Sequence, residues 1–176
     1  MSEPVLTSER LVLTPVAVSD FDDLCGLWRQ EAFTRHIMPQ ALMAEDVWFR
    51  LLRDIGHWAA LGHGNWSIRL QDGGDYLGSV GVFDYHRQMT PAFDAPELGW
   101  GVSPAFQGRG YAAEAVAAGL AWADRALGAS RTVCMIAPDN APSMRLAARV
   151  GFNPYAVTRY KGSAVTLLER PRGPGV

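Results

Sequence analysis

The chain has 176 residues, of which 48% are hydrophobic and 19% are charged. These values are typical of globular domains and differ from the low hydrophobicity and high charge of disordered chains. A domain commonly spans roughly 100 to 200 residues, so we expect a single domain over residues 1–176. The two cysteines, Cys25 and Cys134, lie far apart and form no paired pattern. This excludes a paired-cysteine zinc site and a disulfide scaffold.

The charge argues against two classes of partner. The chain has 16 basic and 18 acidic residues, a formal net charge of −2, so we expect no nucleic-acid binding through a large basic surface. No stretch approaches the roughly 18 to 20 apolar residues of a membrane span, and we expect a cytoplasmic protein without membrane attachment. Residues 1–88 hold 7 basic and 12 acidic residues, whereas residues 89–176 hold 9 and 6. An anionic ligand should therefore prefer the second half.

The pattern of the first half predicts one strand, two amphipathic helices and a hairpin. Residues 10–16 read as a short strand, and Ser19 and Asp22 have capping-box spacing at the start of a helix that extends to residue 28. A second apolar stripe predicts a helix over residues 44–60. The hairpin strands are expected at residues 66–70 and 76–83.

The second half begins with a proline-containing loop and then changes to helix and strand in alternation. Apolar positions recur at helical spacing over residues 110–127, and Gly128 suits the left-handed position that ends a helix. The strands are expected at residues 97–102, 131–137, 155–160 and 164–169, and a short helix at 141–150. The tail from about residue 171 is expected to fray. The order predicts an α/β sandwich, a mixed sheet with helices on both faces.

The most informative segment is QGRGYA, residues 107–112, which lies between a strand and the long helix. Its glycines let the backbone approach a ligand closely, and the unpaired N–H groups of a helix start favour a phosphate. This segment is therefore a candidate diphosphate-binding turn. It has neither the spacing of a dinucleotide fingerprint nor the GK[ST] ending of a P-loop. The alternative is a structural glycine turn before a helix.

Two segments carry a resemblance to a known family. ELGWGVSPAFQGRGYAAEA at residues 97–115 and APDNAPSMRLAARVGF at residues 137–152 resemble the GNAT acyl-CoA-dependent N-acetyltransferases, most of all the Rim-type ribosomal-protein alpha-amino acetyltransferases. TSERLVLTPV and YLGSVGVF also fit, so the likeness covers nearly the whole chain. It implies the GNAT fold, in which the mixed sheet splays between the fourth and fifth predicted strands. The pantetheine arm of acetyl-CoA would pair with the opened edge.

The resemblance also implies which residues hold acetyl-CoA. In the family the pattern [QR]xxGx[GA] binds the pyrophosphate through backbone amides. The matching residues here are Gln107, Gly108, Arg109, Gly110, Tyr111 and Ala112. Asn140 and Ser143 match the positions that contact the pantetheine and the thioester sulfur. From spacing alone, Asn140 could instead cap a helix and Ser143 lie in its first turn, and both roles can coexist.

Catalysis requires a proton acceptor and help for the leaving thiolate. Many GNAT members carry a tyrosine as general acid seven residues after the asparagine, but here that position is Ala147, which leaves Ser143 as the candidate helper. The resemblance places a carboxylate such as Glu97 near the acceptor amine; the alternative is a surface glutamate at a strand edge. Alternation puts Glu97 on one face with Gly99 and Gly101, which would leave room for a ligand. An N–H group at Val102 or its neighbour is a candidate oxyanion donor.

The other candidate residues are weaker. His36, His57, His63 and His86 have no metal-ligand spacing, so we expect no metal site. The tryptophans are expected to pack in the core, although Trp48 and the loop from residue 86 to 93 are candidates for lining the acceptor pocket. Cys134 lies within an apolar strand, which predicts an inert thiol.

We therefore expect an enzyme that transfers an acetyl group from acetyl-CoA directly to a primary amine. The acceptor is left open between a protein N-terminus and a small molecule, and the acidic first half favours a cationic acceptor. The alternative is a non-catalytic acyl-CoA sensor or interaction module, which the missing tyrosine favours and Glu97 and Ser143 oppose. Exposed strand edges and aromatic residues make a homodimer reasonable.

Overall fold

The structure is a computed structural model that describes residues 4–38 and 40–173. Eight strands form one sheet in the order β1-β2-β3-β4-β5-β6-β8-β7. The strands are β1 (Leu6–Thr7), β2 (Leu11–Pro15), β3 (Asn65–Leu70), β4 (Tyr76–Phe83), β5 (Glu97–Val102), β6 (Arg131–Ile136), β7 (Asn153–Tyr160) and β8 (Ser163–Pro171). The helices are η1 (Val18–Asp20), α1 (Phe21–Trp28), α2 (Glu31–Thr34), α3 (Ala44–Leu61), η2 (Pro104–Phe106), α4 (Tyr111–Ala126) and α5 (Ala141–Arg149).

The sheet consists of two antiparallel parts that meet at one parallel pair. Strands β1 to β5 pair antiparallel in chain order, and β6, β8 and β7 form the second antiparallel group. The parallel pair, β5 with β6, needs a long crossover, and α4 supplies it. The predicted mixed α/β fold is therefore confirmed.

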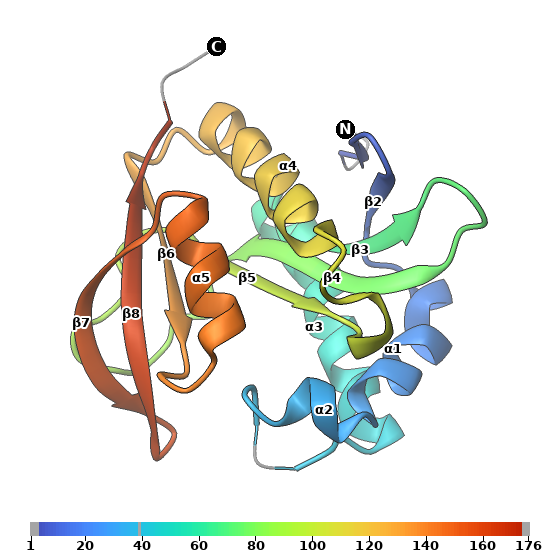
Figure 1. Ribbon diagram of the computed structural model, residues 1–176, viewed down its shortest axis with the longest axis horizontal. Coiled ribbons are helices and arrows are strands. Elements are labelled where there is room, and N and C mark those ends of the chain that lie inside the picture. Colours follow the sequence, from blue (N-terminus) through green and yellow to red (C-terminus); the bar gives the residue numbers. More distant parts are fainter. Residues whose placement is uncertain (1–3, 39, 174–176) are drawn as a thin grey trace.

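Helices cover both faces of the first part of the sheet (Figure 1). On one face α4 lies against β4, where a Cβ added to Gly119 would be 3.7 Å from Val80 Cγ2. On the other face, Asp20 at the start of α1 accepts a hydrogen bond from Ser67 of β3, and the Phe33 ring of α2 covers Gly101 of β5. No helix in the described ranges is long and apolar enough to cross a bilayer.

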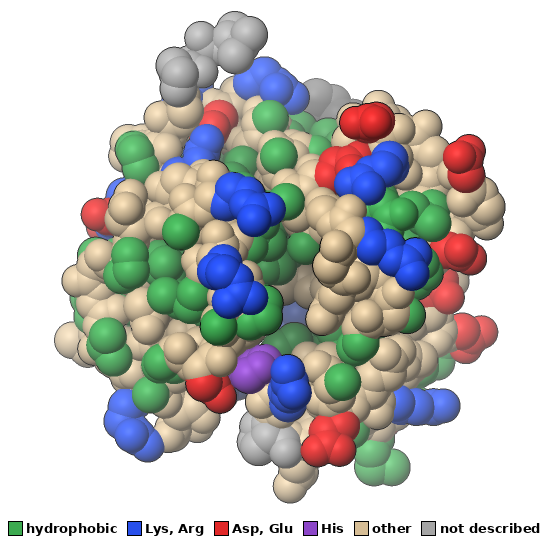
Figure 2. All heavy atoms as spheres, viewed as in Figure 1, with side chains coloured by type: hydrophobic (Ala, Val, Ile, Leu, Met, Phe, Trp, Pro, Cys, Tyr) green, Lys and Arg blue, Asp and Glu red, His purple; other side chains and the backbone are tan. Residues whose placement is uncertain are grey.

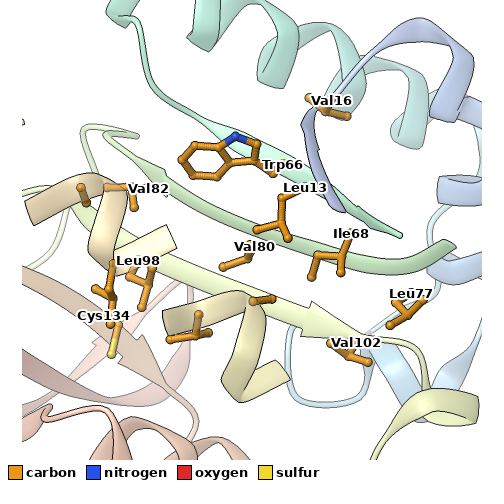
Figure 3. Packing of buried hydrophobic residues seen from close by; sticks show 14 of the residues in the cluster. Leu13, Val16, Trp66, Ile68, Leu77, Val80, Val82, Leu98, Val102 and Cys134 are labelled. Atoms are coloured by element: carbon orange, nitrogen blue, oxygen red, sulfur yellow. The ribbon is translucent and has the colours of Figure 1, made fainter. Parts of the chain in front are cut away.

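The apolar core combines residues of the strands and α4 with residues of α1 and α3 (Figure 3). Trp66, Val80 and Leu98 come from three adjacent strands and are at most 1% exposed, because alternate residues of a strand point to the same face. Cys134 of β6 joins this cluster and is also 1% exposed, so one apolar core extends from the first part of the sheet into the second.

Most predicted elements are present, and the main differences lie at short elements and ends. The capping box of Ser19 is wrong: the 3-10 helix η1 precedes α1, and the carboxylate of Asp20 accepts the N–H of Ala17 at 2.9 Å instead. Gly128 has a φ of 65° after α4, as predicted. The tail is not frayed through Gly173, because the N–H groups of Arg172 and Gly173 donate to Ser130 and Asp124. Residues 174–176 of the predicted tail lie outside the described residues.

Candidate active site

The sheet opens between β5 and β6, as the family resemblance implied. The two strands share one register position, Glu97 opposite Val133, next to a hydrogen bond from the Val133 N–H to Pro96 O at 3.0 Å. Beyond this point β5 is paired with β4 alone, so one of its backbone edges faces the opening. Figure 2 shows the surface hollowed between α4 and α5, with basic side chains near the hollow.

The turn at residues 107–112 lies at the start of α4. Gln107 Nε2 donates to the carbonyl oxygen of Val102 at 2.9 Å, which joins the turn to the end of β5. Gly108 and Gly110 have φ values of 77° and 82°, a backbone region that glycine adopts at no steric cost. Within the described part of the chain, no protein acceptor binds the N–H groups of residues 108–113. Val102 is thus joined to the turn through its carbonyl oxygen, and its role as an oxyanion donor stays a prediction.

Arg10 fixes this turn from the side of β2, a contact that no sequence pattern predicted. Its Nη1 donates to the carbonyl oxygen of Arg109 at 3.0 Å, and its guanidinium lies 4.5 Å from the centre of the Tyr111 ring. Its Nε and Nη2 lie 2.8 and 2.7 Å from Glu114 Oε2. Burial opposes the ionisation of Glu114, but the hydrogen bonds from Ser8 and Arg10 outweigh it and lower the pKa. Residues 8–10 before β2 fitted the family pattern, but their spacing did not indicate a contact with the turn at residues 107–112.

The second motif lies on the other side of the opening, at the start of α5. Asn140 Oδ1 accepts the N–H of Ser143 at 3.3 Å, so Asn140 caps this helix. The capping interpretation is therefore confirmed, whereas contacts with a thioester stay a prediction. Ala147, the position of the missing tyrosine, is fully buried in the core.

Glu97 lies at the point where β5 and β6 part, and it is not a surface residue. The residue is 4% exposed, and its Oε2 lies 2.5 Å from Nε of Arg87, which is also largely buried. Burial raises the pKa of Glu97 above its usual value, although the ion pair with Arg87 acts in the opposite direction. The interpretation as an exposed strand-edge glutamate is wrong, and a role in proton transfer stays a prediction.

The expected free space above the glycines of β5 is also wrong. A Cβ on Gly99 would lie 2.7 Å from Cζ of Phe83, and a Cβ on Gly101 would lie 2.8 Å from the Phe33 ring. The absent side chains therefore make room for aromatic rings and not for a ligand on this face.

The remaining candidates have structural roles. Trp48 packs edge-on against Phe21 with ring centres 5.3 Å apart. Burial raises the pKa of Cys134, as expected for an inert thiol. In residues 4–38 and 40–173 no three side chains of His, Cys, Asp or Glu meet as a metal site would require.

Comparisons with known proteins agree with this geometry. A sequence model of the GNAT acetyltransferase domain matches residues 10–153. A solved structure from Bordetella pertussis, described as a GnaT-family acetyltransferase, is 38% identical, with a TM-score of 0.85. The alignment covers 95% of this chain and 99% of that chain.

Two more distant structures share the fold. One is an acetyltransferase from Salmonella typhimurium that modifies the N-terminal serine of ribosomal protein L7/L12, at 18% identity, TM-score 0.77, and 96% and 99% coverage of the two chains. The other is the spermidine N-acetyltransferase from Vibrio cholerae in complex with CoA and spermine, at 14% identity, TM-score 0.74, and 94% and 97% coverage. The parted strands, the glycine turn before α4 and the match of the domain model lead to one assignment: the chain belongs to the GNAT family and is an acyl-CoA-dependent N-acetyltransferase.

Proposed function

We propose that the protein transfers the acetyl group of acetyl-CoA directly to a primary amine. The observation that carries this proposal is the continuous path from the unpaired N–H groups of residues 108–113 to the open edge of β5. A row of such N–H groups at a helix start binds phosphate oxygens. The pyrophosphate of acetyl-CoA fits there, and the pantetheine fits along β5 as an added strand would.

The transfer forms one C–N bond and breaks one C–S bond. The nitrogen lone pair of the neutral amine attacks the thioester carbonyl carbon, and the sulfur leaves with the bonding electrons as a thiolate. Glu97, directly or through water, takes the proton that the ammonium group must lose and returns it to the solvent. After the attack the nitrogen loses a second proton, which ends on the thiolate and gives the thiol of CoA. Asn140 and Ser143 orient the thioester end, and Ser143 donates a hydrogen bond to the sulfur. The buried position of Glu97 supports its role, because a raised pKa brings a carboxylate closer to neutral pH.

Acetyl-CoA titration of two variants at one position tests the binding mode. Gly110 has a φ of 82°, and asparagine tolerates this region better than other residues with side chains. Gly110→Asp and Gly110→Asn have the same shape and differ in charge. We expect the aspartate variant to bind acetyl-CoA at least about tenfold more weakly than the asparagine variant, because the carboxylate adds a negative charge to the turn beside Arg10, whose Nη2 would lie 3.4 Å from the added Cβ. Equal calorimetric affinities, or no binding by the unmodified protein below millimolar concentrations, would contradict the proposal.

Turnover separates the enzyme from the non-catalytic acyl-CoA module. The enzyme releases the free thiol of CoA only when an amine acceptor is present, whereas a sensor binds acetyl-CoA without releasing it. The family assignment favours the enzyme.

A further inference from the structure

A pocket of about 480 Å³ lies where β4 ends and β5 begins. Its lining residues are His63, Phe83, Asp84, Tyr85, His86, Arg87, Ala92, Phe93, Asp94, Ala95, Pro96 and Glu97. This volume is in the usual range for a small-molecule site. Part of the loop that was a candidate for the acceptor pocket lines it, whereas Trp48 does not.

The pocket lies next to the point where the strands part. Its innermost acidic residue, Glu97, is the residue of β5 that pairs with β6 before the two strands separate. Phe83 and Phe33 fill the face above Gly99 and Gly101. The rings therefore block the way across the glycines, and Glu97 is the residue of β5 that belongs both to the pocket wall and to the junction with β6.

Aromatic and other apolar groups form much of the wall. The rings of Phe83 and Tyr85 are stacked, with centres 4.2 Å apart and planes 16° apart. The hydroxyl group of Tyr85 donates to Asp54 and accepts from Asn65, both at 3.0 Å, so this hydroxyl group is already bonded within the protein. Such a wall suits a compact apolar or aromatic skeleton.

The charges of the pocket leave one carboxylate without an arginine partner. Glu97 is paired with Arg87, and Asp94 is paired with Arg131. Asp84 has no arginine partner among the described residues; its Oδ1 accepts the N–H of His86, and its Oδ2 lies 3.7 Å from the His86 ring. The pocket thus favours a cation and offers no unpaired cation to a ligand carboxylate.

The ring of His63 also lines the pocket. Its Nδ1 lies 2.9 Å from the carbonyl oxygen of Val82, which can only accept, so Nδ1 carries a hydrogen. In the neutral ring Nε2 is then an unprotonated acceptor, suited to an ammonium N–H.

We propose that this pocket binds the acceptor as a primary ammonium on a compact apolar or aromatic skeleton, without a carboxylate beside the amine. The inference rests on the proposed function and narrows its acceptor class to small amines, as opposed to amino acids and peptide N-termini. The ammonium group binds near Asp84 and His63, the skeleton packs on Phe83 and Phe93, and the amine is deprotonated as it moves to Glu97.

A matched set of acceptors tests the chemical class. The probes are 2-phenylethylamine, L-phenylalanine, which has the same skeleton with an added carboxylate, and a pentapeptide that begins with serine. Release of the CoA thiol gives kcat/KM for each. We expect the value for 2-phenylethylamine to exceed the other two by at least about tenfold, because their added groups meet like charge or do not fit. Equal or better use of the amino acid or the peptide would overturn the proposed class.

Three variants test the location of the site. Ala95→Phe fills the pocket, and Ala121→Phe makes the same change on the exposed face of α4. We expect only Ala95→Phe to raise KM for 2-phenylethylamine by about tenfold or more, while KM for acetyl-CoA stays within about twofold. Asp84→Asn keeps an acceptor for the His86 N–H and removes the charge, so it should weaken calorimetric binding of 2-phenylethylamine to the CoA-loaded protein several-fold.

The outcomes separate the two proposals. In one outcome, the protein acetylates amines while Ala95→Phe and Ala121→Phe have equal effects and Asp84→Asn binds the amine as well as the unmodified protein does. That result would overturn the pocket assignment alone. No transfer to any amine by a protein that binds acetyl-CoA would overturn the proposed function, and the acceptor inference with it.

Discussion

Glu97 is subject to two opposing effects at the residue scale. Burial makes the charged carboxylate unfavourable, whereas the Arg87 guanidinium at 2.5 Å stabilises it. Arg87 itself lies between two aromatic rings, 5.3 Å from the centre of Tyr85 and 5.0 Å from that of Tyr160. We therefore propose that Arg87 is a positioning residue, which influences the protonation and the orientation of Glu97.

Glu97→Gln tests the proton acceptor. We expect the acetylation rate at pH 7 to fall by about 100-fold, in the range of general base catalysis. The rate should recover partly as the pH rises, because a larger fraction of the amine is then neutral without help. Initial rates between pH 6.5 and 9.5 measure the effect; a profile parallel to that of the unmodified enzyme would remove Glu97 from the mechanism.

Arg87→Gln tests the positioning role through the pH profile of kcat/KM. A purely structural role of Arg87 would leave the position of this profile unchanged. Without the guanidinium, burial is no longer opposed by the Arg87 hydrogen bond and charge, and the pKa of Glu97 rises further. The acid limb of the profile of kcat/KM against pH should therefore shift to higher pH. Arg125→Gln, on the surface of α4, is the control and should leave the limb in place. An unshifted limb in Arg87→Gln would show that Arg87 does not tune Glu97.

At the element scale, the start of α4 is held by the segment before β2. Glu114, in the first turn of the helix, accepts hydrogen bonds from Ser8 Oγ at 2.7 Å and from the Arg10 N–H at 2.8 Å. The Arg10 side chain adds the bond to Arg109 O described above. These contacts orient the carbonyl group of residue 109 away from the row of N–H groups that we assign to the pyrophosphate.

Arg10→Met tests this orientation. We expect KM for acetyl-CoA to rise by about tenfold while kcat stays within about twofold, because the turn contacts the cofactor and not the reacting atoms. Glu114→Gln distinguishes two modes of action of Arg10. If Arg10 acts by orienting the turn, this variant weakens the binding of acetyl-CoA. If Arg10 acts through its positive charge, the variant strengthens the binding of acetyl-CoA. Steady-state kinetics with acetyl-CoA as the varied substrate gives both values, and an unchanged KM in Arg10→Met would contradict the role.

The helices, strands and contacts differ in how well the sequence alone predicts them. Long periodic segments were predicted within one or two residues, as in α3 and α4, because burial repeats over several turns. Strand β1 and helix α2 were missed, since two and four residues are too few to show a period. The glycine turn was predicted because its backbone demand is local. The partner of Glu97 was not, because Arg87 lies in a loop without periodicity and only the fold brings the two together.

At the scale of the whole molecule, an open sheet must be held together by contacts other than strand pairing. Beyond Glu97 and Val133 the backbone of β5 and that of β6 do not pair, which is what the proposed cofactor site requires. The apolar core that includes Leu98 and Cys134 crosses this junction. Polar contacts add to it: Arg131 of β6 binds Asp94 in the loop before β5, and Thr158 of β7 donates to the carbonyl oxygen of Thr90 in that loop.

The ion pair between Asp124 of α4 and Arg170 of β8 joins the two parts of the sheet, and its loss should weaken the whole fold. Two parallel hydrogen bonds of 3.0 and 2.8 Å connect the side chains, and the Gly173 N–H adds a third. The bonds from Arg170 lower the pKa of Asp124 below its usual value. Because the pair is partly solvated, we expect Asp124→Asn to lower the free energy of unfolding at pH 7 by only about 1 kcal/mol.

The pH dependence of this loss follows from the direction of the pKa shift. A carboxyl group with a lowered pKa in the folded state stabilises the fold fully above its unfolded-state pKa of about 4, and loses this effect as the pH falls further. The difference in urea unfolding between the unmodified protein and Asp124→Asn should therefore stay constant from pH 7 to about pH 5 and shrink below about pH 4. Glu9→Gln, an exposed carboxylate change, should show no such loss at pH 7. A deficit that is absent at pH 7, or that grows as the pH falls, would show that other contacts hold α4 to β8.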